Sequence, residues 1–327
     1  MSASNAMSTS NAMSTSNAMS ASNAMSTRHT VSAGSTVSKM SDLAIQLEHE
    51  FALYGGFDDS QWAAFLNGLE SGEIVVVERE PEKQKAAGKK LEVEMPEENK
   101  PDGLWRVNTW VKVAILSGFK KGGLSDFPSF GVGFFDRPAF PPRHFSLQDE
   151  VRMVPGGSSV RRGSYVAPGV VIMPPSYINV GAYVDEGTMV DSHVLVGSCA
   201  RIGKNVHLSA GVQIGGVLEP PQASPVIVED EAFIGGMCGV FEGIVVRRRA
   251  VLAPGVILTK GTRIYDLVRE CEYFGEVPEN AVVVPGARPA RGTYAREAGI
   301  SLSTPCIVKY RDPKTDAGVA LESALRG

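Results

Sequence analysis

The chain has 327 residues, which is enough for one large domain or two to three small ones with a sizeable core. Its 32 basic and 36 acidic residues give a formal net charge of −4, and the basic residues are scattered, which argues against a nucleic-acid partner. No apolar run reaches the roughly 20 residues that a membrane-spanning helix needs. With 35 glycines and 20 prolines, the composition is typical of an all-β fold with many tight turns.

The first 27 residues repeat a Ser- and Asn-rich hexapeptide, with no acidic residue before Asp42 and no branched aliphatic residue before Val31. Such a segment cannot bury enough apolar surface to offset the entropy that ordering costs. We therefore predict a disordered low-complexity leader over residues 1–40. A transit peptide would also be rich in serine, but it should contain more arginine than the single Arg28.

Helical spacing of apolar residues begins after the leader. Ser41 is a possible N-cap of a first helix, and a second helix is predicted from Asp59. Residues 73–78 predict a strand, residues 80–101 an exposed charged loop, and residues 105–119 a strand followed by a helix.

The middle of the chain repeats with a strict period of six residues. Branched aliphatic residues occupy every sixth position of a first series: Val166, Ile172, Ile178, Val184, Val190, Val196, Ile202, Leu208 and Ile214. After a proline-rich break over residues 215–226, the spacing resumes in a second series: Val228, Ile234, Val240, Val246, Leu252, Leu258 and Ile264.

A period of six fits neither a helix, which repeats every 3.6 residues, nor a plain strand, which repeats every two. It does fit a short strand plus a turn, and three such units close a triangular coil around stacked aliphatic side chains. Hexapeptide repeats are a recognised signature of β-helices. The pattern aliphatic-Gly-x-x-small-x resembles the left-handed class of these folds. The sequence therefore predicts a mainly β protein with a left-handed parallel β-helix of about five coils and an extruded proline-rich loop.

Four segments follow from these elements. They are the leader over residues 1–40, a smaller α/β domain over 41–150, the β-helix over 151–268, and a C-terminal segment over 269–327 with a strand and a terminal helix. We expect that strand at residues 306–310 and that helix at residues 319–325. Four widely spaced cysteines without a CxxC pair indicate thiols of a reducing compartment, so we expect a cytoplasmic protein: Cys199, Cys238, Cys271 and Cys306.

Several motifs are more specific than the repeat. They are Phe134-Phe-Asp-Arg137, Asn179-Val-Gly-Ala-Tyr-Val-Asp-Glu-Gly-Thr-Met-Val-Asp191, Ile202-Gly-Lys-Asn-Val-His-Leu208, Gly215-Gly-Val-Leu-Glu-Pro220 and Thr262-Arg-Ile-Tyr-Asp266. On these motifs the chain resembles the tetrahydrodipicolinate N-succinyltransferase family, from about residue 105 to its C-terminus.

The resemblance implies an acyltransferase of lysine and diaminopimelate biosynthesis. Its substrates would be succinyl-CoA and tetrahydrodipicolinate, in the hydrated or open-chain form, and its products N-succinyl-2-amino-6-oxopimelate and free CoA. It also implies a homotrimer with active sites between adjacent β-helices, no metal and no bound cofactor. The sequence leaves the CoA-contacting residues unknown.

Site residues follow from the resemblance as well. Arg152 matches an arginine that pairs with an acceptor carboxylate, a task suited to a bidentate guanidinium. Asp191 follows the inward Val190, so it should point outward, and it matches an aspartate that binds the acceptor and can take its amine proton. Asp185 stands at the same hexad position one unit earlier, so only the match separates the two. The alternative for Arg152 is an ordinary surface arginine. The alternative for Asp191 is an aspartate that only bonds the backbone of its own turn.

Gly215 and Gly216 would let backbone groups approach a substrate closely, or would serve only the exit of the loop. One departure concerns an acid that many family members carry, because Gly239 stands at that place here whereas Glu242 remains. Either Glu242 is catalytic or Asp191 acts without a second acid.

His193 and His207 are 14 residues apart rather than one 18-residue coil, so we expect no zinc site. The arginines at positions 247–249 could meet CoA phosphates, although a solvated face is the preferred interpretation. Two rival functions remain: transfer from another donor such as acetyl-CoA, and a non-catalytic binding relative, which the missing acid at Gly239 would favour.

Overall fold

The computed structural model describes residues 41–80, 105–126 and 134–312. The predicted leader over 1–40 and the predicted terminal helix over 319–325 lie outside the described residues, as does most of the predicted loop over 80–101.

Both predicted N-terminal helices form, and their caps explain where they begin. Helix α1 spans Asp42–Tyr54 and begins at Ser41, whose hydroxyl accepts a backbone hydrogen bond as an N-cap. Helix α2 spans Asp59–Ser71 and begins with a capping box between Asp58 and Gln61. A glycine in the left-handed conformation follows each helix.

The predicted strand over residues 73–78 forms only at its end. Strand β1 spans Val77–Arg79 and pairs antiparallel with β2, Trp105–Val107, which leads into helix α3, Thr109–Gly118. The two carbonyls before β1 accept hydrogen bonds at 2.8 Å from the side-chain amide and the backbone N–H of Asn108. These contacts to the turn before α3 replace the strand pairing that the sequence predicts there.

An aromatic core joins the three helices and reaches the β-helix. Trp62, Phe65 and Phe140 are buried in it, and Val180 and Cys199 of the β-helix belong to the same cluster. The short elements that complete this part are β3 (Ser125–Asp126), β4 (Phe135–Asp136) and the 3₁₀ turn η3 (Leu147–Asp149).

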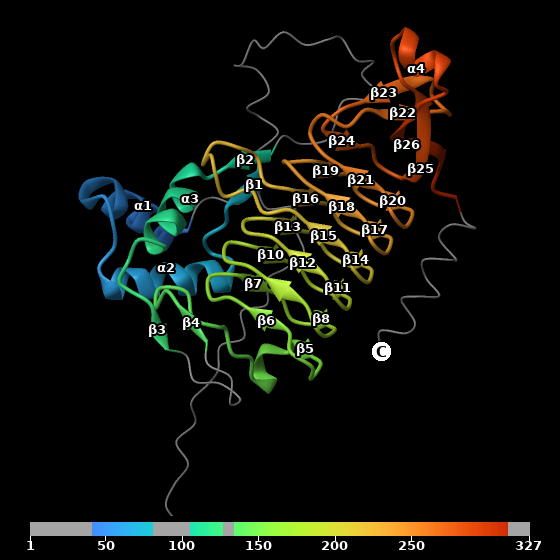
Figure 1. Ribbon diagram of the computed structural model, residues 1–327. Helices are drawn as coiled ribbons and strands as arrows, with labels where there is room; N and C mark the ends of the chain where they lie inside the picture. Colours follow the sequence, from blue (N-terminus) through green and yellow to red (C-terminus); the bar gives the residue numbers. More distant parts are fainter. Residues whose placement is uncertain (1–40, 81–104, 127–133, 313–327) are drawn as a thin grey trace, which may run out of the picture. The chain divides into compact units, whose positions relative to one another are not determined.

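Three parallel sheets of two-residue strands form the β-helix, as predicted (Figure 1). The first sheet contains β7 (Tyr165–Val166), β10 (Tyr183–Val184), β13 (Arg201–Ile202), β16 (Ile227–Val228), β19 (Val245–Val246) and β24 (Glu276–Val277). The second contains β6 (Ser159–Val160), β9 (Tyr177–Ile178), β12 (Leu195–Val196), β15 (Gln213–Ile214), β18 (Gly239–Val240) and β21 (Ile257–Leu258). The third contains β5 (Arg152–Met153), β8 (Val171–Ile172), β11 (Met189–Val190), β14 (His207–Leu208), β17 (Phe233–Ile234), β20 (Val251–Leu252) and β25 (Ala281–Pro289).

The aliphatic series forms the core of the β-helix. Val184 pairs with Ile202, which lies 18 residues later, so one coil uses three hexads. Every aliphatic residue of the two predicted series is buried, and the second residue of each two-residue strand points inward. Burial of each such side chain contributes roughly 1.5–3 kcal/mol, so stacking of the coils is strongly favoured.

Two insertions interrupt the coils. Ile202 pairs with Val228 across the predicted loop over residues 215–226, which confirms that break. The second insertion was not predicted, and in it β22 (Ile264–Asp266) and β23 (Cys271–Tyr273) form an antiparallel hairpin before β24. Ile264 is buried in the same core as the other aliphatic residues, but the expectation that it continues the regular winding was wrong, because it pairs with Tyr273 of β23 and not with a strand of the first sheet.

A β-arm extends the third sheet. Strand β25 pairs antiparallel with β26 (Ser301–Tyr310), and the short helix α4 (Thr293–Glu297) connects them (Figure 1). The strand predicted over residues 306–310 is thus confirmed within β26. Parallel pairing continues to β25, beyond residue 268, and the predicted domain limits stay a prediction.

Candidate functional site

Three rows of turns run along the edges of the β-helix, and the candidate residues lie on two of them. The Asp191 corner comprises the turns from the third sheet to the second, including residues 191–193 and 209–211. The Glu242 corner comprises the turns from the second sheet to the first, including 197–199, 215–226 and 241–243. The charged corner comprises the turns from the first sheet to the third.

Asp191 stands directly after β11, and its carboxylate divides its two oxygens between two neighbours. Oδ1 accepts a hydrogen bond from Ser192 N at 2.7 Å. Oδ2 lies 4.0 Å from Nε2 of His207, which points outward from β14 one coil later. The Asp191 side chain is 28% exposed, so the carboxylate is open to a ligand although one oxygen is bonded within its own turn.

Asp185 has the same local bond but a different place. Its Oδ1 accepts from Glu186 N at 2.9 Å, as Asp191 does from the residue that follows it. It lies on the charged corner, near Arg201 and Lys204, and burial raises the pKa of its carboxyl. The fold therefore separates the two aspartates that hexad position alone could not.

Arg152 opens the third sheet in β5 and is exposed. Strands β5, β8 and β11 are consecutive neighbours in that sheet, which puts Arg152 about 10 Å from the strand that precedes Asp191, at the usual strand spacing. Among the described residues, Arg152 forms no ion pair, so its guanidinium is available to a carboxylate.

Gly215 and Gly216 are packed tightly at the Glu242 corner. A Cβ added to Gly197 would lie 2.1 Å from Gly216 N, and one added to Gly216 would lie 2.8 Å from Ser198 N. Gly215 N donates to the carbonyl of Val240 in the following coil at 2.8 Å. Close backbone packing between coils thus explains both glycines before any substrate is considered.

Glu242 is exposed on the same corner, one coil after Gly215, and its Oε2 accepts from Lys260 N at 3.1 Å. Gly239 lies nearby on the second sheet, where a Cβ would come within 2.5 Å of Cε2 of Phe241. The Phe241 ring therefore fills the space that a larger side chain at position 239 would need.

The candidate residues form two groups on one chain. Arg152 and Asp191 share the third sheet and its corner, whereas Gly215, Gly216 and Glu242 share the Glu242 corner. The second sheet lies between the two corners, and two strand spacings, from β12 after Asp191 to β18 before Glu242, separate the two acids by about 10 Å along the axis. One chain does not bring the two acids together.

A buried lysine holds the extruded loop. Lys112 of α3 is fully buried, and its Nζ donates to the carbonyl of Ala223 at 2.8 Å. Burial lowers the pKa of the Lys112 ammonium, although the nearby Cys199 opposes this shift, and burial raises the pKa of the Cys199 thiol to about 12.

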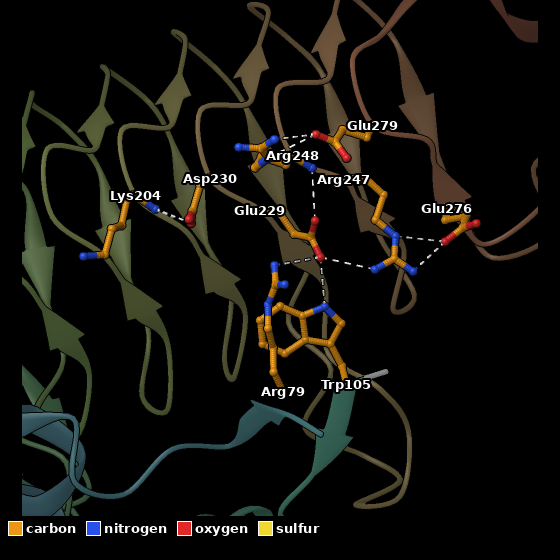
Figure 2. Close-up of polar contacts among 9 residues, drawn as sticks. All are labelled: Arg79, Trp105, Lys204, Glu229, Asp230, Arg247, Arg248, Glu276 and Glu279. Carbon is orange, nitrogen blue, oxygen red and sulfur yellow. Dashed lines mark hydrogen bonds and ion pairs between the residues drawn. The ribbon is translucent and has the colours of Figure 1, made fainter. Parts of the chain in front are cut away.

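The arginines at positions 247–249 are all paired at the charged corner, and Figure 2 shows the pairs of Arg247 and Arg248. Arg247 contacts Glu229 at 3.2 Å and Glu276 at 2.7 Å, and Arg248 contacts Glu279 at 2.8 Å. Arg249 lies 3.0 Å from a carboxylate oxygen of Glu231. These pairs favour the interpretation of a solvated structural face over a phosphate site.

Glu229 also connects this corner to the N-terminal strands (Figure 2). It accepts a hydrogen bond from Trp105 Nε1 at 3.1 Å and lies 3.4 Å from Arg79 NH2. Its side chain is only 6% exposed, so the carboxylate that joins β1 and β2 to the β-helix is nearly dry.

Among the residues that the structure describes, no group of three or more histidine, cysteine, aspartate or glutamate side chains could hold a metal ion. Nor does any helix among the described residues have the length and apolarity to cross a membrane.

Sequence reasoning considered His207 only as a zinc ligand and missed its place beside Asp191, and it did not single out Lys112. His207 could have been placed by adding one 18-residue coil to Met189, with which it pairs. For Lys112 there was no signal, because its acceptor lies in a loop more than one hundred residues away in the sequence.

Comparisons with known proteins agree with this architecture. Residues 225–260 match the family model for the hexapeptide repeat of succinyl-transferase. The 2,3,4,5-tetrahydropyridine-2,6-dicarboxylate N-succinyltransferase of Azoarcus sp. (strain BH72) is 48% identical over 234 residues, or 70% of this chain and 82% of that protein. The enzyme of the same name from Afipia carboxidovorans is 44% identical over 70% of this chain and 83% of its own length. The one from Polynucleobacter asymbioticus is 43% identical over 80% of this chain and 88% of its own length. The chain belongs to the 2,3,4,5-tetrahydropyridine-2,6-dicarboxylate N-succinyltransferase family.

Proposed function

We propose that this protein transfers the succinyl group of succinyl-CoA to the amino group of tetrahydrodipicolinate, which serves the synthesis of diaminopimelate and lysine. The observation that carries the proposal is the 48% identity to an N-succinyltransferase across 82% of that enzyme's length. The β-helix with paired outward residues at its corners supports it, since the transfer needs positioned groups rather than a resident cofactor. Succinyl-CoA is a co-substrate here.

The reaction joins nitrogen to carbon at the expense of a thioester. The acceptor amine attacks the thioester carbonyl, a C–N bond forms, and the C–S bond breaks with its electron pair on sulfur. Asp191 Oδ2 accepts the proton that leaves the nitrogen, and that proton ends on the CoA thiol. A positioned base of this kind typically contributes 10²–10⁴-fold.

Two other groups would position the substrates. Arg152 pairs with a carboxylate of the acceptor in bidentate geometry. The backbone at Gly215 and Gly216 contacts the substrate, because without side chains it allows a close approach. Both glycines also serve coil packing, so substitution there tests two roles at once.

We infer that the site lies between protomers of a homotrimer. Its Arg152 and Asp191 come from one chain and its Gly215, Gly216 and Glu242 from the next, since one chain holds these groups on different corners. The outer rows of the second and third sheets support such contacts because they are largely apolar: Tyr177, Leu195 and Ile257, and Val171, Met189, Phe233 and Val251. The first sheet instead faces the N-terminal elements, with Trp105 5.3 Å from the Arg201 guanidinium.

The second acid has two possible roles, and one variant separates them. If Glu242 is catalytic, Glu242→Gln lowers kcat with the trimer intact. If Asp191 acts without a second acid, the same variant keeps wild-type kcat. A cytoplasmic location is proposed from the free thiols, of which Cys199 and Cys238 are buried.

Steady-state assays with two donors test the function. We expect release of CoA thiol with succinyl-CoA and tetrahydrodipicolinate, and a much lower kcat/KM with acetyl-CoA. A higher kcat/KM with acetyl-CoA would instead identify acetyl-CoA as the preferred donor. Substrate binding without release of CoA would indicate a non-catalytic relative.

A further inference from the structure

The carboxylate of Asp191 has a histidine behind it that the proposed reaction does not use. His207 Nε2 lies 4.0 Å from Asp191 Oδ2, and the two residues belong to adjacent coils of the third sheet. At this distance the two groups make no direct hydrogen bond, and they form an ion pair when the imidazole is protonated.

The two oxygens of the Asp191 carboxylate have different neighbours. Oδ1 is bonded to Ser192 N at 2.7 Å, which fixes one side of the carboxylate. Oδ2 remains, and it is the oxygen nearest the imidazole. An attraction between His207 and Oδ2 therefore sets the rotation of the carboxylate about its last side-chain bond.

His207 is itself held firmly. The His207 side chain is 7% exposed and that of Asp191 is 28% exposed, so the imidazole is the more deeply buried of the two groups. Its ring meets that of Phe233 edge-on, with centroids 5.0 Å apart and planes at 73°. Strand β14 is paired on both sides, with β11 and β17, so its backbone is fixed as well.

We propose that His207 is a positioning residue for Asp191, orienting Oδ2 toward the acceptor amine before attack. The inference rests on the proposed role of Asp191 as the proton acceptor. His207 itself touches neither substrate, and it acts through the carboxylate. Imidazole–carboxylate pairs of this kind orient the group that does the chemistry.

Kinetics of His207→Phe test the inference, because phenylalanine keeps the ring packing against Phe233 and removes the ring nitrogens. We expect kcat to fall about tenfold or more while KM for succinyl-CoA stays within twofold. His207→Gln, which retains an N–H donor, should recover part of the loss. His193→Asn is the matched control, because His193 is exposed on the same turn with a φ of 62° that asparagine tolerates, and we expect wild-type kcat.

A double-mutant cycle shows whether His207 acts through Asp191. We expect Asp191→Asn to lose most activity and His207→Phe to cause no further loss in that background. Wild-type kcat in His207→Phe, or an equal loss in both backgrounds, would overturn the inference.

A crystal structure of His207→Phe gives a readout that does not depend on turnover. We expect the Asp191 carboxylate to rotate or to occupy two conformers, whereas an unchanged single rotamer would overturn the positioning role. If the wild-type protein releases no CoA, the proposed function is wrong. The rotamer of Asp191 in the His207→Phe crystal structure still decides whether His207 positions that carboxylate. Sedimentation and circular dichroism of each variant confirm that it is folded.

Discussion

At the residue scale, the coil geometry gives two similar aspartates different neighbours. Asp185 and Asp191 are one hexad apart and both bond the N–H of the following residue. A step of one hexad moves a residue to the next corner, so only Asp191 lies beside His207, whereas Asp185 lies near the charges of Arg201 and Lys204. Hexad position predicts that a side chain points outward but not what it meets.

The first prediction concerns Asp191. Asp191→Ala should lower kcat about 10²–10⁴-fold because the amine proton loses its acceptor. Asp185→Ala is the matched control and should retain most activity. CoA release and sedimentation are measured for both, and near-wild-type turnover of Asp191→Ala would remove this residue from the mechanism.

A second prediction concerns Gly239, where Phe241 takes up the space of a side chain. Gly239→Ala should lower the free energy of unfolding by about 1–3 kcal/mol, because the new Cβ meets the ring at 2.5 Å. Gly261→Ala is the control, since nothing lies within 4 Å of a Cβ there. Denaturant unfolding measures both, and equal stability of the two variants would contradict this packing argument.

At the element scale, the strands are so short that contacts between coils, rather than propensity, specify them. Each strand of the β-helix before β25 has only two residues, yet the spacing of Val166, Ile172 and their successors was sufficient to predict the three-sheet winding. The spacing could not predict the β22–β23 hairpin. Ile264 keeps the hexad register, and what removes it from the coil is pairing with β23 and the remote β26.

The extruded loop shows the same limit. Its prolines predicted an interruption, but its anchor, Lys112, depends on a contact to Ala223 that no local pattern encodes. The ammonium is buried and donates to that carbonyl, so the charged form is costly in the folded state.

The third prediction follows from this cost. Burial puts the folded-state pKa of Lys112 below 10.5, so the folded protein releases this proton before the unfolded chain does. The contribution of Lys112 to the free energy of unfolding therefore rises as the pH increases from the folded-state pKa of Lys112 toward 10.5.

Urea unfolding at several pH values checks it. The difference in unfolding free energy between wild type and Lys112→Met should move in favour of wild type as the pH rises toward 10.5. The exposed Lys260→Met variant serves as control. Parallel pH curves for wild type and Lys112→Met would show that burial does not shift this lysine.

At the scale of the whole molecule, we propose a site that is complete only when chains combine. The family resemblance predicted Arg152, Asp191 and Glu242 as separate residues, and the fold places Arg152 and Asp191 on the third sheet and its corner but Glu242 on another corner of the same chain. The sequence could not predict this division, because the distances depend on which coil and which corner each residue occupies.

The fourth prediction is therefore the assembly. Sedimentation should give a species of three 34.8 kDa chains, because the outer rows of two sheets are largely apolar. Charged substitution of Leu195, in the middle of the second sheet, should disrupt both the trimer and turnover, whereas charged substitution of the exposed Tyr294 on α4 should disrupt neither. A monomer with full activity would contradict the shared site.

The most direct test of the account is identification of the product. The enzyme is incubated with tetrahydrodipicolinate and succinyl-CoA carrying ¹³C at the thioester carbon, and the mixture is analysed by NMR and mass spectrometry. We predict one labelled amide on the acceptor nitrogen, formed in equal amount with CoA thiol. Labelled free succinate alone, or label left entirely in the thioester, would contradict succinyl transfer by this protein.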